Sequence, residues 1–248
     1  MKLLMTPIEK IGIVYAMDTE AEPLIHALSL KPLASPDTDL PGQLYHGTLG
    51  KLEIRLAVAG RDSRFNIQNI GTNAAVLTTY QLLKDFKPSI LINPGTAGGF
   101  QGKKARIGDV YLCTNGVCFH DRRVPLEEFR KSMLGFYPVI QTPRLASELH
   151  FKTGRVSTGN SLDCTDMDLT HLQLNQADVK DMEAAAIAWV AWVKKVPFLP
   201  VKAVTDFVES HESAAEQFLA NFFVACSYLT TSMVAILDFM ENKKVEEL

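Results

Sequence analysis

The chain has 248 residues, of which 47% are hydrophobic and 21% charged, and its formal net charge is −3 at pH 7. This composition is typical of a folded globular protein and argues against long disordered segments, so we expect a single domain over residues 1–248. The nearly balanced charge offers no basic surface for nucleic-acid phosphates, and we therefore expect a small-molecule partner and no nucleic acid.

The first half of the chain alternates predicted strands and helices. The apolar patch at residues 3–5 is too short for a secretory signal. An apolar run predicts a strand at residues 10–16, and a helical pattern then extends to residue 30 with Pro23 in its first turn. The remaining elements in order are a loop over 32–41, a hairpin with strands 43–48 and 52–59, a long helix over 66–86 and a short buried strand over 89–93.

The second half continues the alternation of strands and helices. Its predicted elements in order are a strand over 109–114, an irregular stretch over 121–141, a helix over 143–149, a strand around 153–157, a strand over 179–182, a helix over 184–193, a strand over 197–204 and a long helix after residue 213. Strands that alternate with helices indicate a mainly parallel sheet with helices on both faces.

Residues 218–237 contain no charged residue and approach the length that spans a bilayer. Most of the polar side chains in this segment fall on one helical face, opposite a face of large apolar side chains. We therefore expect an amphipathic helix that closes the domain, and no membrane partner.

The four cysteines form no C-x-x-C pair, and no histidine stands at metal-like spacing to two of them. The sequence predicts reduced core thiols, no metal site and a cytoplasmic location.

Acidic residues follow three of the predicted strands. They are Glu20, Glu183 and Asp206, while the glycine-rich segment 95–99 provides a fourth, uncharged strand end. Because ligands of open α/β sheets bind beyond the carboxyl ends of strands, these residues are candidates for one site. Each acid taken singly is more often a helix cap or a surface charge. The glycines lack the G-x-G-x-x-G spacing of a dinucleotide-binding loop and are also consistent with a tight turn.

Three carboxyl groups suit the cleavage of a bond to an anomeric carbon. One can activate water, one can bind sugar hydroxyls, and one, if protonated, can donate a proton to the leaving base. An ordinary aspartic acid is only about 0.1% protonated at pH 7, which corresponds to about 4 kcal/mol against the acid form. We expect the apolar neighbours of Asp206 to raise its pKa, and a nearby Lys202 to oppose this.

At these same residues the sequence resembles the methylthioadenosine/S-adenosylhomocysteine nucleosidases of the nucleoside phosphorylase and hydrolase superfamily, and the plant-type enzymes most of all. The resemblance covers about residues 10–241. The motifs that carry it are Ala16-Met-x-x-Glu20, Ile92-Asn-x-Gly-Thr-Ala-Gly-Gly-Phe100, Phe119-His-Asp-Arg-Arg123, Ser157-Thr-Gly-x-Ser-Leu-Asp163, Asp181-Met-Glu-x-Ala-Ala186 and Lys202-Ala-Val-Thr-Asp206.

The resemblance implies a three-layer α/β/α sandwich around a twisted mixed sheet. It also implies cofactor-free hydrolysis of 5′-methylthioadenosine to adenine and 5-methylthioribose in methionine salvage, with S-adenosylhomocysteine as a further candidate substrate. By the same resemblance, Glu20 activates water, Glu183 binds the ribose hydroxyls and Asp206 protonates N7 of adenine. The implied substrate-binding residues are Met17 and Phe218 at the alkylthio group, Thr96, Ala97 and Gly98 at the ribose and base, Met182 against the nucleoside, Leu162 at adenine through its backbone, and Thr205 in support of Asp206.

The resemblance further implies a homodimer in which the His120 loop lies near the neighbouring subunit's pocket. His120 and Asp121 alternatively form a catalytic base pair, or His120 is a buried structural histidine. Asn160 stands where the family usually has Asp, and Lys202 where bacterial members commonly have Arg. Arg61 follows the plant pattern and makes use of S-adenosylhomocysteine, with its longer zwitterionic tail, doubtful.

Two other functions compete with hydrolysis. A purine nucleoside phosphorylase on the same fold would transfer ribose to phosphate, but it would be expected to carry Gly and Arg at the first strand end, where this chain has Glu20. A non-catalytic nucleoside-binding protein would not be expected to keep all three acids.

Overall fold

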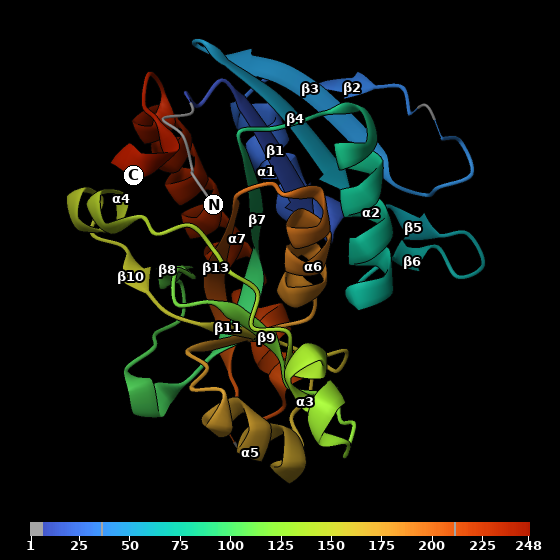
Figure 1. Ribbon diagram of the computed structural model, residues 1–248, viewed down its shortest axis with the longest axis vertical. Helices are drawn as coiled ribbons and strands as arrows, with labels where there is room; N and C mark the ends of the chain where they lie inside the picture. Colours follow the sequence, from blue (N-terminus) through green and yellow to red (C-terminus); the bar gives the residue numbers. More distant parts are fainter. Residues whose placement is uncertain (1–6, 36, 211) are drawn as a thin grey trace.

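A mixed sheet of eleven strands divides the molecule into three layers in a computed structural model that describes residues 7–35, 37–210 and 212–248 (Figure 1). The strands of this sheet are β1 Lys10–Tyr15, β2 Lys31–Leu33, β3 Gln43–Leu49, β4 Leu52–Val58, β7 Ile90–Gly99, β8 Val110–Leu112, β9 Val117–Phe119, β10 Lys152–Thr153, β11 Val156–Thr158, β12 Val179–Asp181 and β13 Phe198–Phe207. The α-helices are α1 Asp18–Ala27, α2 Thr72–Asp85, α3 Glu127–Leu134, α4 Pro143–Glu148, α5 Asp166–Leu174, α6 Ala184–Lys194 and α7 Ala214–Met240. The expected α/β/α sandwich with a mixed sheet is confirmed.

The central strands of the sheet are parallel, and antiparallel pairings join the outer strands to them. Strand β1 lies between β4 and β7, parallel to both, and β7 continues the parallel order to β13. Strands β2, β3 and β4 form an antiparallel meander at one edge, while β8 is antiparallel to β13 and β12 to β7. The parallel centre brings the carboxyl ends of β1, β7 and β13 to the same side of the molecule.

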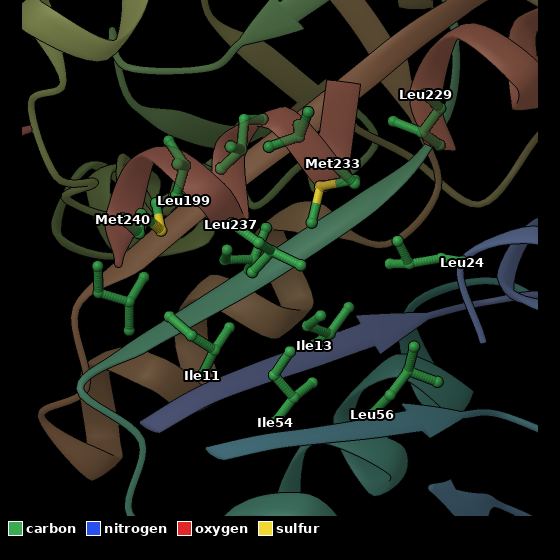
Figure 2. Close-up of a cluster of buried hydrophobic side chains, with 14 of the residues drawn as sticks. Ile11, Ile13, Leu24, Ile54, Leu56, Leu199, Leu229, Met233, Leu237 and Met240 are labelled. Atoms are coloured by element: carbon green, nitrogen blue, oxygen red, sulfur yellow. The ribbon is translucent and has the colours of Figure 1, made fainter. Parts of the chain in front are cut away.

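Two hydrophobic clusters fill the spaces between sheet and helices. On one face, side chains of β1, β4 and β13 meet α1 and α7 (Figure 2), as shown by Ile11, Ile54 and Leu199 opposite Met233 and Leu237. On the other face, α2 and α6 lie side by side and bury their alanines and leucines against the sheet (Figure 1). Burial on both faces explains why the central strands are almost uniformly apolar.

Helix α7 is long and apolar enough to cross a membrane by length and composition. One face of it is instead packed on β13, β7 and α1, and Ser213 caps its N-terminus by accepting a hydrogen bond from the Glu216 amide. The buried residues of this face are Gln217, Phe222, Ala225, Cys226, Leu229, Met233, Ile236, Leu237 and Met240. The helix is therefore packed on one face as the sequence predicts, but Leu219 and Phe223, which the pattern assigns to the apolar face, are exposed.

Several predicted boundaries are wrong. The segment 32–41 is not all loop, because β2 pairs with β3 as an edge strand, a position that tolerates Pro32. The helix predicted from residue 66 begins at Thr72, because residues before it form a small hairpin of β5 Arg61–Asp62 and β6 Ile67–Gln68. Pro23 is the sixth residue of α1 and not in its first turn, because the helix already starts at Asp18.

Other elements are longer than expected or were not predicted. Strand β7 continues through the glycine-rich segment to Gly99, because β13 and β12 supply hydrogen-bonding partners along it, so this segment is no tight turn. Strand β9 has only three residues, and α3 lies within the stretch predicted to be irregular. Helix α5 buries only Leu172 and therefore lacks an amphipathic pattern, although Thr165 and Asp168 form a capping box at its start.

Candidate active site

All eleven residues predicted to act in catalysis or binding line one pocket. The pocket encloses about 760 Å³ of free space, part of it open to solvent. Its predicted lining residues are Met17, Glu20, Thr96, Ala97, Gly98, Leu162, Met182, Glu183, Thr205, Asp206 and Phe218, and the others are Ala16, Ile70, Asn93, Pro94, Gly95, Lys180, Asp181 and Lys202. The structure thus brings the predicted set together, while the function of each member stays a prediction.

Sheet topology accounts for this convergence. Glu20 lies in the first turn of α1 directly after β1, and Thr96 and Asp206 lie on the neighbouring strands β7 and β13. Strand β12 runs antiparallel to β7, with Lys180 opposite Gly98. Its carboxyl end therefore turns back along β7 and delivers Glu183 to the same pocket.

The Glu20 carboxylate is buried and held in place by β7. Its Oε1 accepts hydrogen bonds from the Thr96 amide at 2.9 Å and from Thr96 Oγ1 at 2.7 Å. Burial raises the pKa of Glu20, although the Thr96 hydrogen bonds and the charge of Lys202 oppose the rise. The result is a fixed carboxyl group that holds a proton more readily than an exposed one does.

Lys202 is fully buried behind the pocket. Its Nζ lies 2.9 Å from Asp181 Oδ2 and donates to Asn93 Oδ1 at 2.9 Å. Burial opposes the lysine's charge, but Asp181 and Glu183 outweigh it, so the pKa of Lys202 is raised. This cation offsets the negative charge of the acids around it.

Glu183 is partly buried where β12 ends. Its Oε1 accepts a hydrogen bond from the Gly71 amide at 2.8 Å. Gly71 precedes α2 with a φ of 86°, a left-handed conformation that glycine adopts without strain. Burial, and next the neighbouring Asp181, raise the pKa of Glu183 to about 7.

Asp206 sits beside an irregularity in β13. The pairing with β7 shifts register between Val204 and Asp206, so Thr205 is an extra residue in the strand and its Oγ1 donates to Asp206 Oδ1 at 2.7 Å. Gly98 leaves room for the carboxylate, because a Cβ there would lie 2.8 Å from Asp206 Oδ2.

Burial raises the pKa of Asp206, while Thr205 and Lys180 oppose the rise. The direction agrees with the prediction. The prediction that Lys202 opposes this rise in pKa is wrong. Lys202 is engaged with Asp181, and Lys180 is the cation that opposes the rise.

His120 lies outside the pocket lining and is buried. Its Nδ1 is 3.3 Å from Ser157 Oγ, and burial lowers its pKa to about 4. The structure therefore places the side chain as the buried structural histidine. A catalytic pair with Asp121 is not formed at this pocket, because Asp121 instead accepts hydrogen bonds from Asn160.

Asn160 joins this loop to the start of α2. Its Oδ1 accepts from the Thr72 amide at 3.0 Å and from Thr72 Oγ1 at 2.9 Å, while its Nδ2 donates to Asp121 Oδ2 at 2.9 Å. An amide suits this position because it both accepts and donates. Asn160 thus fixes the residue next to Gly71, which holds Glu183.

Sequence reasoning missed Gly71, Lys180 and the partners of Lys202. Gly71 lay inside a segment predicted to be helical, so no signal pointed to it. Asp181 belongs to the motif that includes Glu183, and Asn93 belongs to the glycine-rich motif. These two motifs were the signals that could have pointed to Asp181 and Asn93. Within residues 7–35, 37–210 and 212–248, no group of three or more His, Cys, Asp or Glu side chains is arranged to hold a metal ion.

The fold and the acid-lined pocket correspond to a known superfamily. The family model of the phosphorylase superfamily matches residues 10–237, and the chain belongs to this superfamily. Within it, the chain is 40% identical over 247 residues to the 5′-methylthioadenosine nucleosidase of Arabidopsis thaliana, covering 99% of this chain and 92% of the relative.

Two further relatives agree with this similarity. A 5′-methylthioadenosine/S-adenosylhomocysteine nucleosidase of Arabidopsis thaliana is 38% identical over 246 residues, which are 98% of this chain and 96% of the relative. The apo structure of the Arabidopsis thaliana 5′-methylthioadenosine nucleosidase superposes with a TM-score of 0.95 at 40% identity, covering 98% of this chain and all of that one.

Proposed function

We propose that this protein hydrolyses the N-glycosidic bond of 5′-methylthioadenosine, giving adenine and 5-methylthioribose. The observation that carries the proposal is the convergence of Glu20, Glu183 and Asp206 on one pocket. The similarity to nucleosidases over nearly the whole chain supports it. We place the reaction in methionine salvage, since its product keeps the methylthio group.

Asp206 acts as the general acid in this proposal. Its burial favours the protonated form, which can give its proton to N7 of the purine as the electron pair of the C1′–N9 bond moves to the base. Loss of that pair leaves positive charge on the sugar. The carboxylates of Glu20 and Glu183 are close enough to the pocket to stabilise such charge.

Glu20 and Glu183 act on the sugar side. Glu20, fixed by Thr96, accepts a proton from water while the water oxygen bonds to C1′. Glu183 binds ribose hydroxyls, with its position set by the Gly71 amide. The proton on Glu20 then returns to solvent and Asp206 is reprotonated, so that one nucleoside and one water give one base and one sugar.

The pocket fits water better than phosphate as the nucleophile. Among the described lining residues, the cations are Lys180 and Lys202. Lys202 is bound to Asp181 and Asn93, and Lys180 to two backbone carbonyls, so both are already engaged. The Glu20 carboxylate would also repel a phosphate group, which disfavours a phosphorylase.

The 5′ end of the pocket favours a short apolar substituent. Met17, Ile70 and Phe218 line the pocket and would contact this substituent. Arg61 of the β5–β6 hairpin pairs with Asp18 at 3.3 Å, directly next to Met17. We propose that this hairpin limits use of S-adenosylhomocysteine, whose 5′ tail is longer and charged.

We further propose a homodimer. The outer faces of α2 and α6 lie side by side and carry exposed apolar residues, namely Leu77, Tyr80, Trp189, Trp192 and Val193. Such a patch is typical of a subunit interface. The His120 loop, which leads into the exposed residues Leu126 and Phe129, would lie near the neighbour's pocket.

A cytoplasmic location is also part of the proposal. Its support is the cysteines, all four of which are free thiols.

Adenine release by the purified protein tests the main proposal. We expect release from 5′-methylthioadenosine without phosphate, and loss of turnover by orders of magnitude in Glu20→Gln and Asp206→Asn with some ligand binding retained. The exposed residues Glu22 and Asp85 give matched controls, Glu22→Gln and Asp85→Asn. A requirement for phosphate, with ribose 1-phosphate as product, would overturn hydrolysis, and unchanged turnover in the two variants would remove these residues from the mechanism.

A further inference from the structure

Lys180 is a buried cation in the pocket wall that the proposed chemistry does not use. It lies on β12, paired with Gly98 of β7 on one side and Ser157 of β11 on the other. Its Nζ donates to the carbonyl oxygens of Ser161 at 2.6 Å and Leu162 at 2.9 Å. Among the described residues, no carboxylate lies within ion-pair distance of it, and burial lowers the pKa of Lys180 although Cys164, Asp206, Asp163 and Asp168 oppose this.

Lys180 also stands between two cavities. Together with Leu162 and Asp206, it lines both the candidate active site and a second hollow on the far side of this wall. The ammonium has three N–H donors, and the two carbonyls use only two of them. Lys180 on β12 and Asp206 on β13 are both paired with Gly98 of β7, so the positive charge is held on the same part of the pocket wall as the carboxyl group that has to lose a proton.

We propose that Lys180 is a positioning residue that holds the loop of Leu162 against the base and stabilises the negative charge that forms on Asp206 when its proton moves to the purine. This inference rests on the proposed function, since it concerns the same proton transfer. A charge close to a developing opposite charge lowers the barrier most where water is excluded.

Burial and the charge of Lys180 have opposite effects on the pKa of Asp206. Burial raises the pKa of Asp206, and the Thr205 hydrogen bond and then the cation of Lys180 limit the rise. A general acid works best when its pKa lies near the working pH. Burial therefore favours the protonated form of Asp206, and the charge of Lys180 favours the loss of its proton.

Other titratable groups surround the pair and have to be held constant in any test. In the active-site pocket they are Glu20, Asp181, Glu183 and Lys202. In the second hollow they are Asp163, Cys164 and Glu212. Asp168 and His120 also interact electrostatically with Lys180.

Lys180→Gln separates the two effects of the lysine. A glutamine amide can still donate to the Ser161 and Leu162 carbonyls, but it carries no charge. We expect the alkaline limb of the kcat/KM profile to move to higher pH by about one unit or more. An adjacent positive charge lowers the pKa of a carboxyl group by about this amount, and the variant lacks that charge. Lys180→Arg keeps the charge and should leave the limb within a few tenths of its original pH, and the exposed Lys87→Gln is the matched control.

A direct titration keeps the inference independent of turnover. The Asp206 carboxyl carbon can be followed by ¹³C NMR in the substrate-free protein and assigned by its loss in Asp206→Asn. We expect its midpoint to rise in Lys180→Gln and to stay in place in Lys180→Arg. If the midpoint shifts but the original protein releases no adenine, the coupling between Lys180 and Asp206 is supported and the proposed function is overturned.

An unchanged midpoint and pH limb in Lys180→Gln would overturn the inference, even if KM rose. That outcome would leave Lys180 as a purely structural clamp on the 161–162 loop.

Discussion

Two ionisable residues four positions apart on β13 illustrate how closely the surroundings of a side chain decide its chemistry. Lys202 is buried among Asp181, Asn93 and the acids of the pocket, which keep it charged. Burial raises the pKa of Asp206, although the hydrogen bond from the Thr205 hydroxyl opposes the rise. The same strand thus holds a permanent cation and a proton donor.

Asp206 should lower the stability of the protein at neutral pH. Its pKa in the folded state is raised, so the stability it contributes is fully present below its unfolded value near pH 4 and is lost as pH rises through the folded value. Asp206→Asn has no proton to lose at this position. We expect its Tm to exceed that of the original protein at pH 7 to 8 and to approach it near pH 4, as measured by thermal unfolding across pH. A Tm difference that does not vary with pH would contradict this.

Lys202 should contribute strongly to the stability of the folded protein. Lys202→Met would leave Asp181 buried without its cation, and breaking a buried ion pair in this way costs about 3–5 kcal/mol. The Lys10–Glu53 pair has the same N–O distance, 2.9 Å, but is about half exposed. Lys10→Met should therefore cost less than about 1 kcal/mol. Urea unfolding of both variants compares the two, and similar losses would show that burial is not the deciding factor.

At the scale of elements, the prediction was correct where the residue pattern was consistent with only one type of secondary structure. Strand β1, helix α6 and helix α7 follow from apolar runs and helical periodicity, because each is buried in the way its pattern indicates. The start of α2 could not be predicted, since the β5–β6 hairpin before it depends on pairing of two-residue strands. Helix α5 was not predicted, because only Leu172 of this helix is buried and the sequence therefore shows no amphipathic pattern.

Helix α7 allows burial to be tested with one substitution at two places. Leu237 is fully buried against the sheet, whereas 73% of Leu219 is exposed on the same helix. Leu237→Ala should lower the free energy of unfolding by about 2–5 kcal/mol, because it removes apolar contacts and leaves a cavity. Leu219→Ala should change it by less than about 0.5 kcal/mol. Equal effects in chemical unfolding would mean that α7 is not held by the face described.

At the scale of the whole molecule, the three acids could be predicted to meet because parallel strands bring their carboxyl ends together. The partners that adjust these acids could not be predicted in the same way. Gly71 binds Glu183 from a segment 112 residues away, and Lys180 and Asp206 lie on the two strands that flank β7, both opposite Gly98. Such contacts depend on tertiary distances that no local pattern records.

The apolar face of α2 and α6 leads to a prediction about assembly. Trp192 is 59% exposed near the middle of this face, and Trp192→Glu would place a charge in the proposed interface. We expect the variant to elute as a monomer in size-exclusion chromatography with light scattering. Leu174→Glu changes an apolar residue on α5 that is 69% exposed, and this variant should remain a dimer. A dimeric Trp192→Glu would move the interface elsewhere.

The pocket is built from residues that span the chain from Met17 to Phe218. No contiguous fragment contains its walls, so a partly refolded chain with native helices would still have no place for a nucleoside. Recovery of turnover during refolding should consequently lag behind the return of the helical circular-dichroism signal. By mass action, a tight nucleoside analogue should also delay thermal melting of the entire protein and not just of one region.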